Sequence, residues 1–286
     1  METYTHGNYE FFIVYDPKQR EIAVASIRDR VVHRLVYDYL VPIWDKSFCY
    51  GAWSCRKNKG LLGAIDHAHT NIRKYQDGWL WRSDIAKFFD SINHEQLKFI
   101  LGTKSKDDKI LQLMNKIIDS YQVVNRAGTS TSYFRPESSS VGLPIGNLTS
   151  QIFANIYLNE FDQFILHTIK PLGYTRYGDD FVIWFPTELD ALTAQIVATQ
   201  FLGDILSLRV NQKHDKVQKT CHKLSYLGVE LWPNGKRLQK RVVKRIDDRL
   251  SLDNAASYYA LAKRHMPARY QKQLLHKILA IIEQMW

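Results

Sequence analysis

The chain has 286 residues, of which 45% are hydrophobic and 24% are charged, the composition of a folded protein with a sizeable core and not of a disordered tail or a fibre. Lys and Arg outnumber Asp and Glu by 39 to 29, which gives a net charge of +10, and 7 Trp, 16 Tyr and 13 Phe accompany them. This combination suits a polyanion with stackable bases, although a solvated basic surface would explain the charge equally well.

The cysteine content and the hydropathy are those expected of a cytoplasmic protein. Cys49, Cys55 and Cys221 form no Cys-x-x-Cys pair, so we expect neither a disulfide framework nor a cysteine zinc site. The N-terminus lacks a basic segment followed by a long apolar run, and no stretch reaches about 18 consecutive apolar residues. We therefore expect no signal peptide, no membrane span and no membrane partner.

The first part of the chain alternates strand and helix signals. Residues 10–24 contain two short β-like runs around an Asp-Pro turn signal. Residues 27–44 carry apolar side chains at helical spacing, which predicts an amphipathic helix that ends near Pro42. A second helix is expected over 60–75, and residues 79–85 are typical of a strand.

A short helix after Asn93 and a long loop or hairpin come next. The loop is predicted over 125–140, where Ser, Thr, Gly and Pro dominate. A further helix follows, because the apolar residues of 148–161 form one stripe, and Asn147 or Thr149 would cap it.

The clearest alternation of apolar and polar residues lies at 173–185, and it predicts a tight hairpin. Gly178 supplies the backbone conformation that its turn needs, with Asp179 and Asp180 directly after it. The last fifty residues indicate a helical appendage. Strand, helix and hairpin signals together predict an α+β sheet domain.

Three acids follow apolar or aromatic strands and are the candidates for chemistry. Asp84 ends one predicted strand, and Asp179 and Asp180 lie in the hairpin turn. Adjacent carboxylates repel one another and are costly to desolvate unless a cation neutralises them, so they favour a hard divalent ion over a plain solvated turn. Two magnesium ions about 3.5–4 Å apart would hold the attacking and leaving oxygens of a phosphoryl transfer.

Four segments, in this order, resemble the conserved boxes of reverse transcriptases over residues 17–228. The Tyr-Gly-Asp-Asp of the hairpin resembles the Tyr-x-Asp-Asp box of that family. The four segments are DIAKFFDSI (84–92), GLPIGNLTSQ (142–151), YGDD (177–180) and LSYLG (224–228).

The resemblance implies an enzyme, an RNA-directed DNA polymerase that uses two Mg²⁺ ions. It makes Asp84, Asp179 and Asp180 the catalytic metal ligands and the backbone carbonyl of Ile85 a further metal contact. Asp90 is the weaker candidate because it lies after the bend.

Further residues match positions where the family binds the incoming nucleotide. Phe89 would clash with a ribose 2′-hydroxyl and so select deoxynucleotides, unless it is an ordinary core aromatic. Arg20, supported by Lys18, would clamp the triphosphate, unless both lie in a plain surface loop. Lys213 resembles the lysine that follows the palm helix, and Lys216 competes for that place.

The box at 142–151 departs from the usual pattern and resembles the enzymes of diversity-generating retroelements, which copy a template RNA with errors. Ile145 stands where most members carry Gln, and with Gly146 and Gln151 it would contact the nucleotide. An apolar residue there offers packing but no hydrogen bond, and discrimination by shape alone is worth about 1–3 kcal/mol. We therefore expect error-prone synthesis.

The resemblance also implies template or primer contacts and partners. Arg56 and Lys59 would contact the template, unless they form a plain basic loop, and Leu227 and Gly228 belong to the primer-grip hairpin. The expected partners are a template RNA, an RNA/DNA hybrid, deoxynucleoside triphosphates and a small, basic, oligomeric accessory variability protein.

The expected architecture is a right hand. Fingers would cover 1–75 and 105–141, the palm 76–104 and 142–231, and a small helical thumb 232–286. Two other functions stay open: a retron-like or stand-alone defence reverse transcriptase, and a catalytically silent RNA-binding scaffold.

Overall fold

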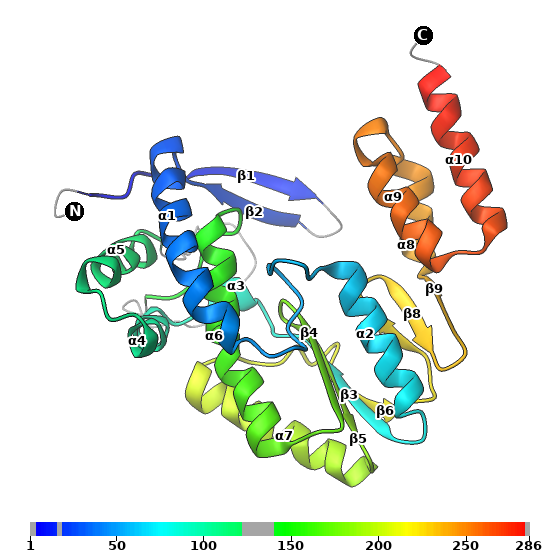
Figure 1. Ribbon diagram of the computed structural model, residues 1–286, viewed down its shortest axis with the longest axis horizontal. Coiled ribbons are helices and arrows are strands. Elements are labelled where there is room, and N and C mark those ends of the chain that lie inside the picture. Colours follow the sequence, from blue (N-terminus) through cyan, green and yellow to red (C-terminus); the bar gives the residue numbers. More distant parts are fainter. Residues whose placement is uncertain (1–3, 16–18, 122–139, 284–286) are drawn as a thin grey trace.

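The structure is a computed structural model that describes residues 4–15, 19–121 and 140–283. The predicted Asp-Pro turn after residue 15 and nearly all of the predicted 125–140 loop lie outside the described residues. Helices pack on both faces of a central sheet, which confirms the α+β class (Figure 1). None of the described helices combines the length and the apolar character needed to cross a membrane.

The central sheet has four antiparallel strands in the order β4-β5-β3-β6. Aromatic and β-branched side chains dominate its middle strands, which favours extended backbone buried on both faces. The predicted strand at 79–85 and the predicted hairpin at 173–185 are thereby confirmed. The strands are β3 (Trp79–Ser83), β4 (Gly173–Tyr177), β5 (Asp180–Phe185) and β6 (Lys216–Lys219).

Two hydrophobic cores meet at this sheet because successive side chains of a strand point to opposite faces. Trp81 and Phe181 point into the larger core, which contains α6 (Leu148–Phe164) and α7 (Glu188–Leu206). The opposite face packs on α2 (Leu61–Lys74) and the C-terminal elements.

The helix α6 begins as predicted with Asn147 at the N-cap position, but this side chain makes no capping hydrogen bond. The side chain of Asn147 is buried and donates to the Ala23 carbonyl (2.7 Å) while accepting from the Ala25 N–H (3.2 Å). Thr149 lies inside the helix, where its hydroxyl is 3.3 Å from His33 Nδ1. Asn147 therefore fastens the end of strand β2 to α6 instead of capping the helix.

The helix α1 (Ile27–Trp44) confirms the predicted helix, although its buried face differs from the one expected. It continues past Pro42, because the buried Trp44 anchors its last turn and the Asp45 N–H still bonds to the Val41 carbonyl. Its buried stripe also contains polar residues, whereas several of the apolar residues that predicted the helix are exposed. The buried residues are Asp29, His33, Val36, Leu40 and Trp44, and the exposed ones include Ile27, Val31 and Leu35.

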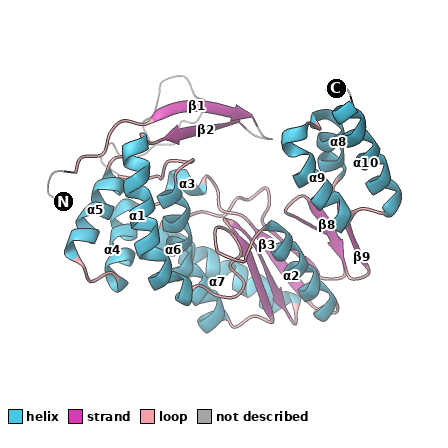
Figure 2. Cartoon of the chain, turned by 45° about the horizontal axis from the view of Figure 1, so that its top comes forward, coloured by secondary structure: helices cyan, strands magenta, loops and turns pink. Residues whose placement is uncertain are grey.

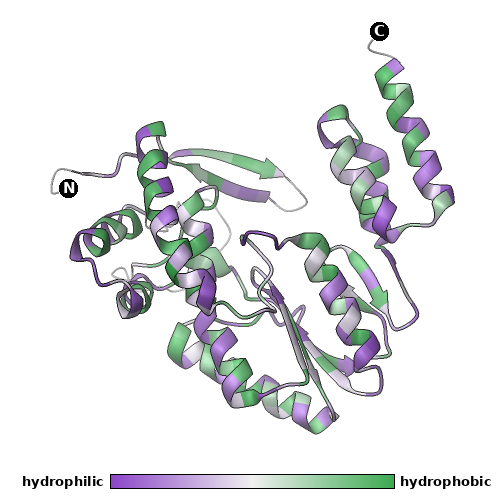
Figure 3. Ribbon diagram, viewed as in Figure 1, coloured by the Kyte–Doolittle hydropathy of each residue, from purple (hydrophilic) through white to green (hydrophobic). Residues whose placement is uncertain are grey.

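The N-terminal hairpin projects from the helical part of the molecule (Figures 1 and 2). Its first strand, β1 (Glu10–Tyr15), is mostly hydrophobic, whereas β2 (Gln19–Val24) begins with hydrophilic residues (Figure 3). Arg249 in α8 (Lys240–Arg249) donates to the Tyr15 carbonyl at 3.4 Å, so the end of the hairpin contacts the C-terminal part.

The remaining elements are short helices beside α1 and a C-terminal unit beyond the sheet. Asn93 caps the predicted short helix through the Gln96 N–H, and three helices follow a second, three-stranded sheet, which confirms the helical appendage. The bounds are η1 (Asp45–Ser47), α3 (Phe88–Ser91), α4 (His94–Lys104), α5 (Asp108–Asp119), η2 (Ile165–Ile169), β7 (Leu224–Tyr226), β8 (Val229–Trp232), β9 (Gly235–Leu238), α9 (Leu252–His265) and α10 (Ala268–Glu283).

Candidate active site

The register of β3 and β5 brings the three candidate acids to one edge of the sheet. Ser83 pairs with Phe181, so the residue after Ser83, Asp84, lies beside Asp180 on the neighbouring strand. Tyr177 pairs with Asp180, which leaves Gly178 and Asp179 as a two-residue turn. Gly178 has a φ of +64°, the left-handed conformation that such a turn requires.

The carboxylates influence one another electrostatically. Burial raises the pKa of Asp180 to about 6; Arg82 opposes this rise, and the charges of Asp179 and Asp84 add to it. The pKa of Asp179 is also raised, mainly by burial and further by Asp84, while Arg20 and its own backbone N–H act in the opposite direction. Three acids thus share a site where negative charge is costly.

The contacts of the acids show how the site accommodates that charge. Arg82 binds Asp180 through Nη2 (3.0 Å) and Nε (3.3 Å). Asn211 donates to Asp84 Oδ2 at 3.3 Å, whereas Asp84 Oδ1 is buried without a hydrogen-bond partner. A buried carboxylate oxygen without a hydrogen-bond partner is the kind of ligand atom that a hard divalent cation would bind.

The side chains are not yet arranged as a metal-binding cluster. Within residues 4–15, 19–121 and 140–283, no group of three His, Cys, Asp or Glu side chains could hold a metal ion as placed. One of the three carboxylates, that of Asp180, is instead paired with the guanidinium of Arg82. The donor chemistry therefore fits a divalent ion, and Arg82 supplies part of the positive charge.

A buried ion pair holds the turn that carries Asp179. Arg176 on β4 binds Asp162 on α6 through two hydrogen bonds of 2.6 and 2.7 Å, and both side chains are buried. Its third nitrogen, Nη1, donates to the Gly178 carbonyl at 2.9 Å. The pair thus connects the rigid helix to the peptide group immediately before Asp179.

The preceding peptide group, between Tyr177 and Gly178, is also held. The Gly178 N–H donates to Ser54 Oγ at 3.0 Å, and Asn155 on α6 donates to the Ser54 carbonyl at 2.8 Å. Arg56 fixes the loop that carries Ser54, because its guanidinium donates to the Asp45 carboxylate and to three backbone carbonyls. In the structure, the Arg56 guanidinium therefore stabilises this loop.

Of the expected triphosphate and sugar contacts, the structure relates Arg20 to the acids. Lys18 lies outside the described residues. Arg20 is exposed on β2, and its charge lowers the pKa of Asp179, so it lies within electrostatic range of the acids. Phe89 is half-buried and packs edge-on against Phe88, with its ring centroid 5.5 Å away.

The box at 142–151 packs directly against β2. The Ile145 carbonyl accepts from the Ala23 N–H at 2.9 Å. Gly146 has a φ of +116°, and a Cβ there would lie 2.7 Å from Ile22 Cγ2, so a larger residue would collide with β2. Gln151, in the first turn of α6, is exposed.

The predicted template and primer contacts, Lys59 and the pair Leu227 and Gly228, lie in two separate parts of the chain. Lys59 lies over the rings of Tyr50 and Trp53, 3.8 and 3.9 Å from their centroids, and donates to the Tyr50 carbonyl. Leu227 and Gly228 form the β7–β8 turn with φ of +48° and +83°. The Gly228 carbonyl accepts from Gln239, so this turn is joined to the start of α8.

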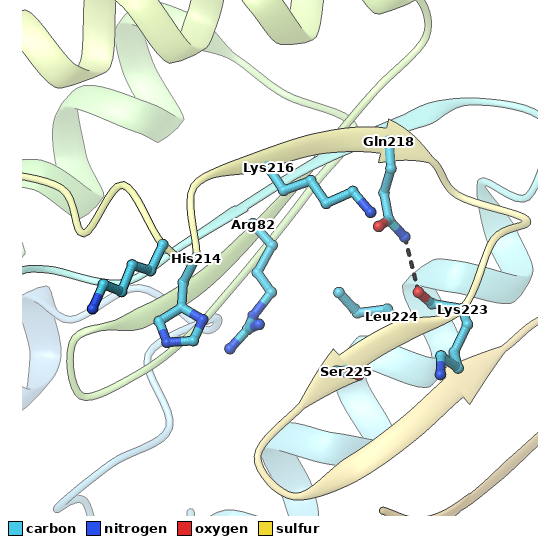
Figure 4. Close-up of a pocket in the computed structure, with 8 residues that line it drawn as sticks. Arg82, His214, Lys216, Gln218, Lys223, Leu224 and Ser225 are labelled. Atoms are coloured by element: carbon cyan, nitrogen blue, oxygen red, sulfur yellow. Dashed lines mark hydrogen bonds between the residues drawn. The ribbon is translucent and has the colours of Figure 1, made fainter.

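Both candidate lysines of the palm, Lys213 and Lys216, line one cavity of about 240 Å³, as Arg82 does (Figure 4). Sequence reasoning missed Arg82, although it stands two residues before Asp84 and therefore on the same face of the strand. It also missed Arg176 and Asp162. The available signal was that a basic residue lies in a predicted buried strand and an acidic residue in a largely apolar helix.

Comparisons with known proteins agree with these observations. The family described as "Reverse transcriptase (RNA-dependent DNA polymerase)" matches residues 16–231. Protein YkfC of Escherichia coli is 25% identical over 292 residues, which covers 87% of this chain and 74% of that protein. The group II intron-encoded protein LtrA of Lactococcus lactis is 28% identical over 151 residues, 52% of this chain and 23% of that protein.

Solved structures resemble the fold over most of the chain. The telomerase of Candida tropicalis, in complex with a fragment of telomeric RNA, gives a TM-score of 0.58 at 13% identity and covers 90% of this chain. That of Candida albicans gives 0.55 at 12% identity and covers 82%. The present chain spans 49% and 45% of these two chains. At such low identity the likeness shows the polymerase fold alone.

Proposed function

The chain belongs to the reverse transcriptase (RNA-dependent DNA polymerase) family, and we propose that it synthesises DNA on an RNA template from deoxynucleoside triphosphates. The observation that carries this proposal is the strand register, which sets Asp84 beside the Asp179-Asp180 turn with one buried carboxylate oxygen unpartnered. Buried carboxylates such as Asp179 and Asp180, whose pKa values are raised by burial and by neighbouring acids, are suited to bind divalent cations, and in-line phosphoryl transfer uses two such ions.

Asp84, Asp179, Asp180 and the backbone carbonyl of Ile85 would hold two Mg²⁺ ions. When bound, the ions supply charge neutralisation at the attacking and leaving oxygens. The residues of the chain do the rest: Arg176 and Asp162 keep the Gly178-Asp179 turn in place, and Asn211 orients Asp84.

The proposed substrate contacts come from the resemblance to the family's boxes. Lys18 and Arg20 bind the triphosphate, and Phe89 excludes the 2′-hydroxyl. Ile145, Gly146 and Gln151 line the nucleotide site beside β2, and Lys213 serves the leaving pyrophosphate. Lys59, on the loop that Arg56 fixes, contacts the template, and Leu227 and Gly228 support the primer.

The same positions give the proposed hand. Fingers comprise 1–75 and 105–141, the palm 76–104 and 142–231, and the thumb 232–286. The palm then contains the four-stranded sheet and the three acids, and the thumb contains the three C-terminal helices.

The test of polymerase activity is Asp179→Ala. We expect primer extension on an RNA template to be abolished, because the proposed metal site loses one of its carboxylate ligands, while RNA binding is largely retained. Asp204→Ala, an exposed acid on α7, is the matched control and should extend normally. Full extension by Asp179→Ala would overturn the proposal.

We further propose that the enzyme is of the diversity-generating retroelement type, makes error-prone cDNA and works with a basic accessory variability protein. Ile145 supports this, because an apolar side chain gives the nucleotide site no hydrogen bond with which to reject a wrong base. Ile145→Gln should lower the error rate of cDNA, measured by sequencing products of both enzymes. Equal error rates would favour a retron-like or defence enzyme, or one that works with an intron-like RNA as several relatives' names suggest.

A further inference from the structure

A cavity beside the acids carries an unusual concentration of positive charge. It has a volume of about 240 Å³ and is lined by residues of β3, β6, the segment before β6 and the start of β7. No Asp or Glu among the described residues lines it. The lining residues are Arg82, Lys213, His214, Lys216, Gln218, Lys223, Leu224 and Ser225.

The cations of this cavity are only partly neutralised. Lys223 pairs with Glu230 at 2.9 Å, but Glu230 also pairs with Arg237 at 2.8 Å. Lys213 and Lys216 have no acidic partner among the residues that the structure describes. Cations brought together without counter-charges repel one another, so an anion that entered the cavity would be bound favourably.

Several elements contribute cations to the one cavity. Lys216, Arg82 and Lys223 line it from β6, β3 and the residue before β7 (Figure 4). Gln218 donates to the Lys223 carbonyl at 3.1 Å, which joins β6 to the β7–β8 hairpin and holds the walls together. The cavity is smaller than the roughly 300–1,000 Å³ of sites for drug-sized ligands, so it suits a small anion better than a whole nucleotide.

Arg82 connects the cavity to the catalytic acids. It lines the cavity, and its guanidinium is bound to the Asp180 carboxylate at 3.0 Å. A guanidinium binds a carboxylate or a phosphate with the same planar pair of N–H groups, so the two ligands compete for Arg82.

We propose that the cavity binds a phosphate group and that Arg82 exchanges Asp180 for this phosphate. Phosphate binding then releases the Asp180 carboxylate from its ion pair, so the anion site and the acid site are coupled. Phosphate binding in the cavity does not depend on the polymerase proposal. The role of the released Asp180 carboxylate as a metal ligand does rest on it.

The binding test uses the full-length protein and inorganic pyrophosphate without divalent cations or nucleic acid. Calorimetry should show binding that weakens about tenfold in Lys216→Gln and in Lys223→Gln, since one charge-assisted hydrogen bond is removed. Lys109→Gln, an exposed lysine on α5, is the control and should bind normally. Equal affinity in all four proteins, or no binding, would overturn the proposal even if the enzyme polymerises.

Two further arms test the exchange and the source of the phosphate. Asp180→Asn frees Arg82 and should raise pyrophosphate affinity several-fold, and clearly more than Asp84→Asn, which removes a nearby charge that Arg82 does not bind. Equal rises in pyrophosphate affinity in the two variants would overturn the exchange by Arg82.

A competition experiment identifies the source of the phosphate. Displacement of pyrophosphate by a primer–template duplex would identify a backbone phosphate as the ligand, and simultaneous binding would identify a free anion.

Discussion

At the scale of single residues, buried charges decide the geometry of the catalytic turn. The Arg176–Asp162 pair is completely enclosed, and it reaches the Gly178 carbonyl with its remaining nitrogen. A buried pair adds little stability compared with apolar residues, but removal of one partner leaves an uncompensated charge. Its contribution is therefore to fix one peptide group.

Substitution of Arg176 separates these two effects. Arg176→Met should lower the free energy of unfolding by about 3–5 kcal/mol, because Asp162 stays buried and unpaired. Arg176→Lys keeps the charge but cannot bond to Asp162 twice and to Gly178 as well. We expect a smaller loss in urea unfolding, with kcat lowered more than KM is raised. An unchanged kcat in Arg176→Lys would contradict the positioning role.

Removal of the charge at Asp179 should stabilise the protein. Its pKa is raised in the folded state, so the charged form destabilises the fold above the unfolded pKa, and protonation removes this cost at low pH. Asp179→Asn should raise the free energy of unfolding at pH 7.5 and raise it less at pH 4, measured by thermal unfolding. A gain that is equal at both pH values would contradict this cause.

At the scale of elements, side chains outside the helices and strands join one element to the next. The buried Asn147 holds the end of β2 against α6, and Gly146 allows the close approach. This junction sets the N-terminal hairpin, and with it Arg20, relative to the acids. Neither contact is local in the sequence.

Asn147→Ala tests this junction. It leaves the Ala25 N–H and the Ala23 carbonyl without their partners, and we expect the free energy of unfolding to fall by about 2–4 kcal/mol. Urea unfolding measures the loss, and Gln112→Ala, an exposed position on α5, is the control. A loss below that of the control would show that the hairpin does not depend on Asn147.

At the scale of the whole molecule, the net charge of +10 is spread over elements on both sides of the acids. The hairpin and α8 come into contact through Arg249 and Tyr15, so basic residues of the C-terminal helices lie near the same edge as Arg20. Lys240 and Lys244 are exposed one turn apart on α8. In the proposed thumb they would contact the backbone of an RNA/DNA hybrid.

The salt dependence of hybrid binding tests this arrangement. A double substitution, Lys240→Gln with Lys244→Gln, should weaken binding and reduce the slope of log affinity against log salt by about 2. The pair Lys106→Gln with Lys109→Gln, next to and on α5, should leave the slope nearly unchanged. Equal slopes for the two double variants would remove α8 from the nucleic-acid surface.

The sequence alone determined several elements, among them the strand β3 and the β4–β5 hairpin, and it marked the three acids as candidates, because alternation, helical spacing and a doublet of carboxylates after a strand are local patterns. Its boxes also indicated the reverse transcriptase family, which the family match over residues 16–231 confirmed. The tertiary structure alone decided that Asp84 meets the Asp179-Asp180 turn through the register of β3 and β5, and that Arg82 and Arg176 bind distant acids. The tertiary structure also decided which face of α1 is buried. Ile27 and Leu35 are exposed, because burial depends on neighbouring elements that no local pattern encodes.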